Sequence, residues 1–181
     1  MFKKIFNKKD MIELQDILRN NKKTITTAES CTGGLVASMI TKVSGSSDIF
    51  NGSIVSYSNK IKNQELNVNN ETLEKFGAVS TEVVNEMLDG AIKKFEADFA
   101  IAISGIAGPT GATKNKPVGT VVIGISDANN VKIIDTFYFK GTREEVQIQA
   151  AKTALKKILK FIKKTLDNWF IFQYNSSPFW V

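Results

Sequence analysis

The chain has 181 residues, of which 43% are hydrophobic and 23% are charged, a composition typical of a folded globular domain and not of a disordered chain. It contains no histidine and one cysteine. This excludes serine–histidine and cysteine–histidine catalytic pairs, disulfides within the chain, and zinc sites built from these residues. No apolar segment approaches the ~18 residues needed to span a membrane, and the lysine-rich amino terminus lacks the apolar segment of a signal peptide. These features predict a cytoplasmic protein.

The net charge of +6 is concentrated at the two ends of the chain. Residues 1–23 hold seven basic and three acidic side chains, and residues 152–181 hold six and one, whereas residues 24–151 hold eleven and fourteen. The central part is therefore mildly acidic. Only two of the cations are arginines, the residue type that most often reads bases in DNA. We expect the lysines to form solvated helix faces and expect no nucleic-acid partner.

In the first half of the chain, the spacing of the apolar residues alternates between helical and extended periods. It predicts a helix over 9–21, a buried strand over 24–28, a helix after Gly34, a strand over 51–58, and short helices over 60–66 and 71–76.

The second half continues the alternation and ends in a long helix. It predicts a helix capped by Ser80, a strand over 98–104, a glycine-rich loop over 105–117, an antiparallel hairpin of strands over 118–127 and 131–140, and a helix from a Thr142–Glu145 capping box to about Thr165. Together the elements predict an α/β fold: a single three-layer α/β/α domain over residues 1–166, with a mixed sheet of about five strands flanked by helices.

Residues 167–181 are predicted to form a separate aromatic-rich tail. Six of the seventeen aromatic residues lie in the last fourteen positions, which are too few to cross a bilayer. Packing on its own domain or on a neighbouring subunit is favoured over docking to another protein or to a membrane surface. We also expect a homo-oligomer, a dimer or larger.

The clearest chemical signal is the run Glu29-Ser30-Cys31-Thr32-Gly33-Gly34, between a predicted strand and a predicted helix. A hydroxyl at this junction is well placed as a nucleophile, because the free N–H groups of the helix's first turn favour negative charge nearby. The glycines would let a substrate approach the backbone closely. Ser30 would serve equally as a helix N-cap, and Cys31 is an alternative nucleophile whose pKa a helix N-terminus could lower.

A serine nucleophile in a chain without histidine needs a lysine or a carboxylate as its base. Lys60 and Lys62 follow the predicted strand over 51–58. A lysine becomes a base near neutral pH only where burial or a neighbouring cation lowers its pKa. The alternative is that both are solvated surface lysines.

A second signal is the glycine-rich stretch from Ser104 to Thr120. Backbone N–H groups in such turns can hold an anion such as a phosphate, and Arg143 could add a bidentate contact. The stretch matches neither a dinucleotide-binding fingerprint nor a Walker sequence. A purely structural loop and an exposed arginine are the alternatives.

Five blocks occur in a fixed order: Thr26 to Gly34, Tyr57-Ser58-Asn59, Gly77 to Ser80, Ser104 to Pro109, and Lys116 to Val121. Over about residues 10–165 the chain resembles the CinA carboxy-terminal domain family, the nicotinamide-nucleotide amidohydrolases (NMN deamidases). The larger CinA proteins carry an additional amino-terminal domain, for which this chain has no room, so it resembles the stand-alone form.

The resemblance implies hydrolysis of the carboxamide of nicotinamide mononucleotide by a Ser/Lys dyad, without a metal or cofactor. Carried over, the nucleophile is Ser30, the base is Lys62, with Lys60 ranked second, and Tyr57 assists proton transfer or orientation. Glu29 would favour the cationic pyridinium. The full set of expected substrate contacts is Glu29, Cys31, Thr32, Gly33, Gly34, Ser104, Gly105, Gly108, Lys116 and Arg143. The alternatives are a nucleotide-binding module without turnover and a competence or DNA-damage accessory protein.

Overall fold

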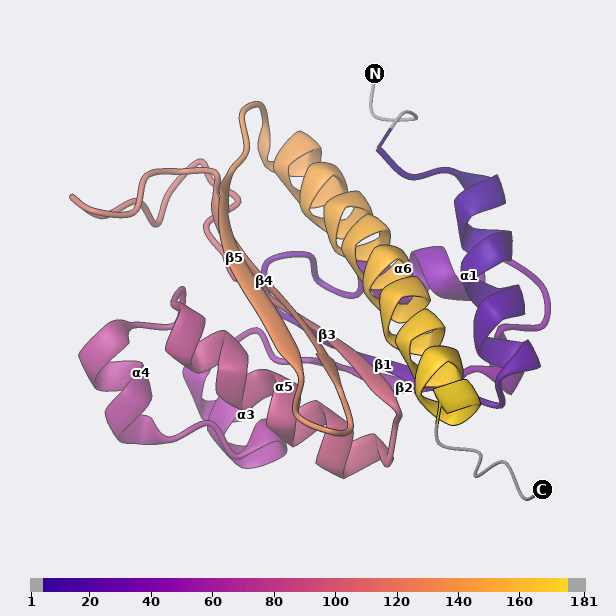
Figure 1. Ribbon diagram of the computed structural model, residues 1–181. Helices are drawn as coiled ribbons and strands as arrows, with labels where there is room; N and C mark the ends of the chain where they lie inside the picture. The colour runs from indigo at the N-terminus through magenta and orange to yellow at the C-terminus, as the bar shows by residue number, and fades with distance from the viewer. Residues whose placement is uncertain (1–4, 176–181) are drawn as a thin grey trace, which may run out of the picture.

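The computed structural model describes residues 5–175, with side chains as far as Leu166. A five-stranded mixed sheet lies between two helical layers (Figure 1), which confirms the predicted single α/β domain. The strand order is β2-β1-β3-β4-β5. The strands are β1 (Ile25–Glu29), β2 (Phe50–Val55), β3 (Phe99–Gly105), β4 (Thr120–Asp127) and β5 (Lys132–Tyr138).

The helices divide between the two faces of the sheet. One layer holds α1 (Lys8–Asn20), α2 (Leu35–Thr41) and α6 (Arg143–Asn175), and the other holds α3 (Asn59–Leu66), α4 (Asn70–Phe76) and α5 (Thr81–Phe95). A short 3-10 helix, Ser46–Asp48, precedes β2. No helix in the described range combines the length and apolarity that crossing a membrane would require.

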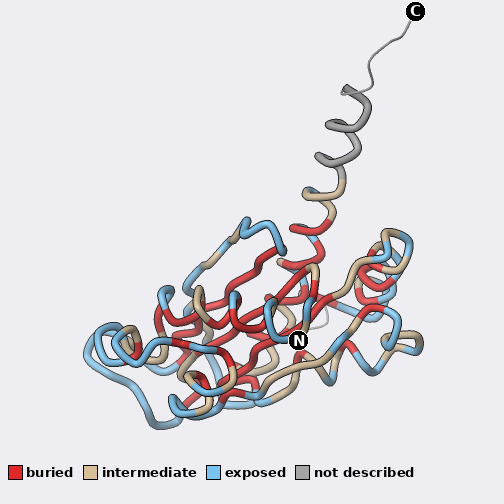
Figure 2. The backbone as a smooth tube through the Cα atoms, turned by 90° about the horizontal axis from the view of Figure 1, so that it is seen from below, coloured by how far each residue is buried: buried red, intermediate tan, exposed pale blue. Residues whose placement is uncertain are grey.

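The central strands are buried on both faces. In β3, Ile101 and Ile103 pack into the core on the α1, α2 and α6 side, whereas Ala100 and Ala102 pack under α5. Successive side chains of a strand point to opposite faces, so a strand covered on both sides is apolar without interruption. Figure 2 shows the buried residues gathered in the middle of the molecule and many of the exposed ones along its outer turns.

The order of the strands creates a crevice at one edge of the sheet. Strand β1 is parallel to β2 on one side and to β3 on the other. The chain leaves β1 through α2 on one face and reaches β3 through α3, α4 and α5 on the other. The carboxyl end of β1 leads through α2 to β2 on one side, and the carboxyl end of β3 leads through the glycine-rich loop to β4 on the other side. The connections therefore diverge at the carboxyl ends of β1 and β3, which is where open α/β sheets bind ligands.

Most predicted elements are found within a few residues of their expected bounds. The β4–β5 hairpin is antiparallel, and the capping box holds, since Thr142 N–H donates to Glu145 and Glu145 N–H donates to Thr142 Oγ1. The prediction that the last helix ends near Thr165 is wrong, because α6 continues to Asn175 through a stretch without glycine or proline. The aromatic side chains of the predicted tail lie outside the described residues.

Candidate active site

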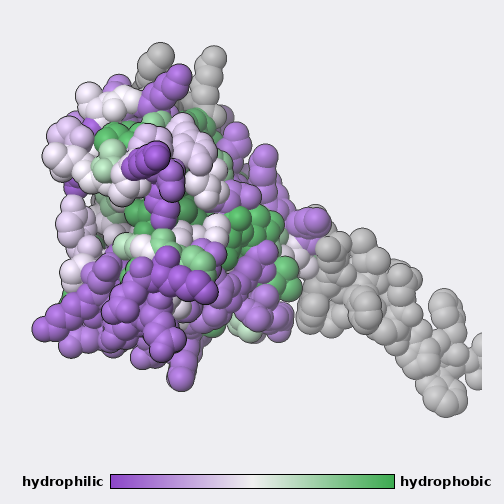
Figure 3. Space-filling model, turned by 90° about the vertical axis from the view of Figure 1, so that its left-hand side faces the viewer, coloured by the Kyte–Doolittle hydropathy of each residue, from purple (hydrophilic) through white to green (hydrophobic). Residues whose placement is uncertain are grey.

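A cavity of about 290 Å³ opens at the carboxyl ends of β1 and β3. Figure 3 shows the face that carries α4 and the glycine-rich loop, where hydrophilic side chains cover the lower part of the molecule. Residues from five separate segments meet in the cavity. Its lining comprises Ser30, Cys31, Tyr57, Lys62, Ala78, Val79, Ser104, Gly105, Ile106, Ala107, Gly108, Thr110, Gly111 and Arg143.

Ser30 and Lys62 form a hydrogen-bonded pair in this cavity. The Lys62 ammonium nitrogen lies 3.0 Å from Ser30 Oγ and 2.7 Å from the Ser56 carbonyl oxygen, and donates to both. Lys62 is only 1% exposed and Ser30 8%. Ser58 caps α3 by accepting from Ile61 N–H, and the first turn of the helix then directs Lys62 inward.

Lys60 takes a different position although it lies on the same helical turn. It is exposed, whereas Lys62 is buried, because a step of two residues turns a side chain to the other side of a helix. Of the two lysines, Lys62 contacts Ser30 Oγ.

The environment of Lys62 favours its neutral form. Burial lowers the pKa of the Lys62 ammonium from 10.5 to about 8, because the charged form loses its hydration. No carboxylate forms a salt bridge with Lys62 within the described part of the chain. A useful fraction of neutral amine is therefore present near neutral pH, as a general base requires.

Cys31 does not have the properties of a competing nucleophile. Its thiol is 5% exposed, and burial raises its pKa from 9.0 to about 12, so the reactive thiolate is absent at neutral pH. The expected lowering by a helix N-terminus fails, because α2 begins only at Leu35, with Gly34 as its N-cap. For the same reason Ser30 is not the N-cap that its sequence position suggested.

The turn between β1 and α2 holds Ser30 at the end of the strand. Ser30 N–H donates to the Ile103 carbonyl across to β3, at 2.9 Å, and Gly33 N–H donates back to the Ser30 carbonyl, at 3.0 Å. Gly33 and Gly34 have φ angles of 62° and 95°, a region that other residues rarely adopt. The glycines are therefore required by the turn itself and do not line the cavity.

Glu29 is turned away from the cavity. Its side chain is fully buried, and its carboxylate accepts hydrogen bonds from Thr32 Oγ1 and from the N–H groups of Gly34, Val36 and Ala37. The expectation that Glu29 contacts a substrate cation is not met in this arrangement. Glu29 and Thr32 instead form an internal cap of α2.

Arg143 and Tyr57 meet at the mouth of the cavity. The guanidinium donates to Tyr57 Oη at 2.7 Å and to the Gly108 carbonyl at 2.8 Å. Tyr57 is 62% exposed, so it lies at the entrance and not beside the buried pair. Two of the five donor N–H groups of an arginine are used here.

The glycine-rich loop forms the opposite wall. Ser104 Oγ donates to the Ala78 carbonyl at 2.7 Å. A Cβ on Gly105 would lie 2.9 Å from Cys31 Sγ, so only glycine fits. Lys116 does not line the cavity: it donates to the Phe76 carbonyl at 2.8 Å, at the C-terminal end of α4, where a cation is favourable.

Two positioning contacts escaped the sequence analysis. The Ser56 carbonyl holds Lys62, and Gln147 donates from α6 to the Cys31 carbonyl at 2.7 Å. A backbone acceptor carries no sequence signal. Gln147 carried a sequence signal, because it is a polar residue next to the apolar stripe that holds Val146 and Ala150.

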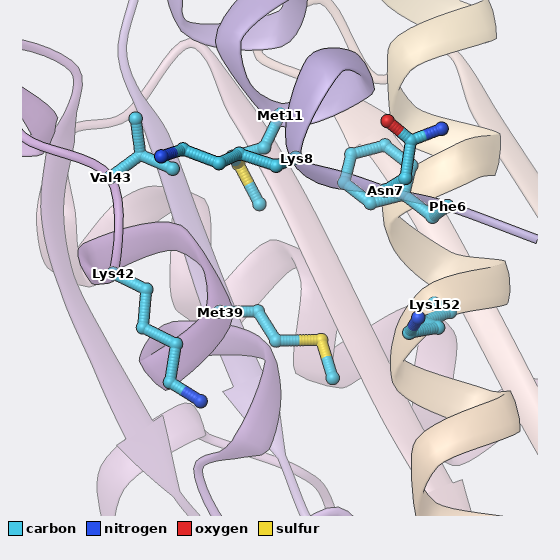
Figure 4. Close-up of a pocket in the computed structure, with 8 residues that line it drawn as sticks. All are labelled: Phe6, Asn7, Lys8, Met11, Met39, Lys42, Val43 and Lys152. Atoms are coloured by element: carbon cyan, nitrogen blue, oxygen red, sulfur yellow. The ribbon is translucent and has the colours of Figure 1, made fainter. Parts of the chain in front are cut away.

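A second hollow, of about 390 Å³, lies among α1, α2 and α6 (Figure 4). Its floor is apolar, with Met11 and Met39, and Lys8, Lys42 and Lys152 lie around it. It contains no nucleophile paired with a base. Groups of three or more histidine, cysteine, aspartate or glutamate side chains able to hold a metal are absent from the described residues.

Comparison with known proteins gives the class to which this fold and site belong. The model of the CinA C-terminal domain matches residues 8–162. The chain therefore belongs to the CinA C-terminal domain family.

Individual relatives agree with this assignment. A CinA-like protein of Syntrophomonas wolfei is 51% identical over 146 residues, which is 81% of this chain and 35% of that protein. A putative competence-damage inducible protein of Caldicellulosiruptor saccharolyticus is 47% identical, over 80% of this chain and 34% of that protein. The chain thus spans about a third of the length of these curated relatives.

Solved structures match over nearly their whole length. A CinA-superfamily protein from Klebsiella pneumoniae aligns with a TM-score of 0.82 at 31% identity, covering 86% of this chain and 97% of that one. A competence/damage inducible protein from Agrobacterium tumefaciens aligns with a TM-score of 0.78 at 36% identity, covering 85% and 96%.

Proposed function

We propose that the chain is a cytoplasmic amidohydrolase that converts nicotinamide mononucleotide to nicotinic acid mononucleotide and ammonia. The observation that carries the proposal is the buried Lys62 nitrogen 3.0 Å from Ser30 Oγ, with no salt bridge to a carboxylate among the described residues. This is the spacing of a nucleophile and its base. The resemblance of the sequence to the nicotinamide-nucleotide amidohydrolases supplies the substrate.

In the first step, neutral Lys62 accepts the proton of Ser30 as Ser30 Oγ attacks the carboxamide carbon. A C–O bond forms, and the carbonyl π electrons move to oxygen. On the β1–α2 turn the N–H groups of Ser30, Gly33 and Gly34 already have acceptors, and we assign the oxyanion to those of Cys31 and Thr32 together with the loop over 105–111. One such donor is typically worth ~3 kcal/mol.

In the second step, the Lys62 ammonium protonates the amide nitrogen, the C–N bond breaks, and ammonia leaves an ester on Ser30. A water molecule then attacks the ester carbon while Lys62 accepts its proton, and that proton returns to Ser30 Oγ as the acid is released. Lys62 thus acts alternately as base and acid. The bonds formed and broken balance without a redox partner.

The electrostatics of the cavity suggest how the nucleotide is oriented. A helix N-terminus is a common phosphate site, but the first amides of α2 are occupied by Glu29. Arg143 at the cavity mouth offers unused N–H donors. We therefore assign the phosphate to Arg143 and the adjacent glycine loop, with the carboxamide directed inward toward Ser30.

The test is ammonia release from nicotinamide mononucleotide by the purified protein, with Ser30→Ala beside it. We expect release by the wild type and a loss of at least about four orders of magnitude in kcat for the variant. Mass spectrometry should detect an acyl adduct on Ser30 after rapid quenching. Binding of the nucleotide by calorimetry without ammonia release would instead support a nucleotide-binding module without turnover.

A further inference from the structure

Glu29 is a buried carboxylate with an unusual set of partners. Its two oxygens accept five hydrogen bonds, all from residues 27–37: Thr27 Oγ1 at 3.3 Å, Thr32 Oγ1 at 2.7 Å, and the N–H groups of Gly34, Val36 and Ala37 at 3.1, 3.1 and 2.8 Å. No lysine or arginine forms a salt bridge with it among the described residues. Burying a charge is costly unless it is fully hydrogen-bonded, and here the segment that carries Ser30 supplies all the bonds.

The backbone of Glu29 reaches the other half of the site. Its carbonyl accepts from Ser56 N–H at 2.8 Å, and the Ser56 carbonyl in turn accepts from Lys62 at 2.7 Å. Glu29 is therefore linked through its side chain to the turn that follows Ser30, and through its main chain to the acceptor that holds Lys62.

We propose that Glu29 is a positioning residue for the Ser30–Lys62 pair. Its carboxylate holds the turn over residues 30–34 and the start of α2, and this fixes Ser30 Oγ within reach of Lys62. The proposal rests on the proposed function for its substrate, but the positioning of Ser30 can be measured without it.

The decisive variant is Glu29→Gln, which keeps the shape of the side chain and replaces one acceptor oxygen with an NH₂ donor. Both carboxylate oxygens accept hydrogen bonds from backbone N–H groups, one from Gly34 and Val36 and the other from Ala37. In either orientation of the substituted amide, its NH₂ group would therefore face at least one backbone N–H donor and lose that hydrogen bond. We expect kcat for ammonia release to fall about 100-fold, the cost of displacing a reacting group by ~1 Å, with KM within about threefold.

A second measurement reads the position of Ser30 directly. A fluorophosphonate reacts when Ser30 Oγ bonds to phosphorus, fluoride leaves, and Lys62 takes the hydroxyl proton. We expect the labelling rate of Glu29→Gln to fall by a factor similar to that of kcat. The matched control is Asn7→Ala, which removes the side-chain cap of α1. It should lower the melting temperature but leave kcat and labelling within about twofold.

The outcomes separate the alternatives. Glu29→Gln with a lowered melting temperature but unchanged kcat and labelling would overturn the proposal and leave Glu29 a purely structural cap. If Glu29→Gln does not fold, Thr32→Val removes one bond to the carboxylate: a fall of about fivefold or more in labelling supports the proposal, and an unchanged rate overturns it. A wild type that is labelled at Ser30 but releases no ammonia refutes the proposed substrate, and the labelling comparison still decides the role of Glu29.

Discussion

Two strand-to-helix connections meet at the same edge of the sheet, and each carries a buried ionisable side chain. The two side chains differ in how fully they are hydrogen-bonded. After β1, the Glu29 carboxylate receives five hydrogen bonds. After β2, the buried Lys62 ammonium finds two neutral oxygens, those of Ser30 and Ser56. The first connection stabilises its charged group, whereas the second leaves a cation incompletely paired. Under the proposed function, the turn after β1 supplies rigidity and α3 supplies reactivity.

The under-solvated lysine has a cost for folding. A pKa lowered from 10.5 to about 8 corresponds to about 3 kcal/mol against the charged form in the folded state. A lysine with a lowered folded-state pKa destabilises the fold most below pH 8. The penalty fades between about pH 8 and 10.5, because there the unfolded chain alone still binds the proton.

Among the substitutions that test this comparison, the largest expected effect comes from Lys62→Met, which removes the poorly paired cation. We expect kcat/KM for ammonia release to fall about 10³-fold, within the range for loss of a general base. We also expect the free energy of unfolding at pH 7 to rise by about 1–2 kcal/mol, since an apolar side chain of similar length replaces a buried charge. Kinetic assays and urea denaturation measure the two effects.

Lys60→Met is the control for this substitution, because Lys60 lies on the same turn of α3 but is exposed. It should change kcat/KM by less than about twofold and stability by less than about 0.5 kcal/mol. A Lys62→Met protein that is less stable than the wild type would show that the buried Lys62 cation is not poorly paired, and that the two connections do not differ in this respect.

The pH dependence sharpens the comparison. Since the neutral amine is the base, kcat/KM should rise about tenfold per pH unit below 8 and level off above it. Above that range, from about pH 8 to 10.5, the wild type should gain stability, and Lys62→Met should not. A kcat/KM that stays flat between pH 6 and 9 would contradict assignment of Lys62 as the base.

The sequence predicted the order of elements well because their signals are local. The apolar period gave the strands and helices, and Thr142 with Glu145 marked the start of α6. The choice between Lys60 and Lys62 could not be made from composition, because it depends on which side of α3 faces the end of β1. The resemblance made that choice, and the contact with Ser30 is consistent with it.

The partners of Glu29 were beyond sequence reasoning for a different reason. They depend on the positive φ angles of Gly33 and Gly34, which bend the chain so that the amides of α2 return to the preceding strand. The same bend delays the start of α2 to Leu35, and this is why Ser30 is not an N-cap. Lys116 was misplaced similarly, since its contact with Phe76 joins a long loop to a distant helix.

A smaller effect is expected at the cavity mouth, where neither buried charge is involved. Arg143→Lys keeps a positive charge. A lysine lacks the planar guanidinium with which Arg143 donates to Tyr57 and to the Gly108 carbonyl at the same time. We expect KM for the mononucleotide to rise about tenfold with kcat within about threefold. Tyr57→Phe, which removes one of the two contacts, should raise KM less. A fall in kcat alone would place Arg143 at the reacting carboxamide and not at the phosphate.

Among the residues that line the cavity, the smallest effect should come from Cys31, the neighbour of Ser30. Burial keeps its thiol protonated, with a pKa of about 12, so it takes no part in proton transfer. Its sulfur packs where Gly105 leaves room for it, and Cys31→Ser preserves that volume. We expect a decrease of about threefold in kcat/KM, from the hydroxyl placed in an apolar contact, and slow alkylation of the wild-type thiol until the protein is denatured. Rapid alkylation of the folded protein, or a loss of activity as large as that of Ser30→Ala, would transfer the nucleophile from the serine to the thiol. It would also remove the reason for comparing the two connections, because a thiolate would then supply the reactivity that we assign to Lys62.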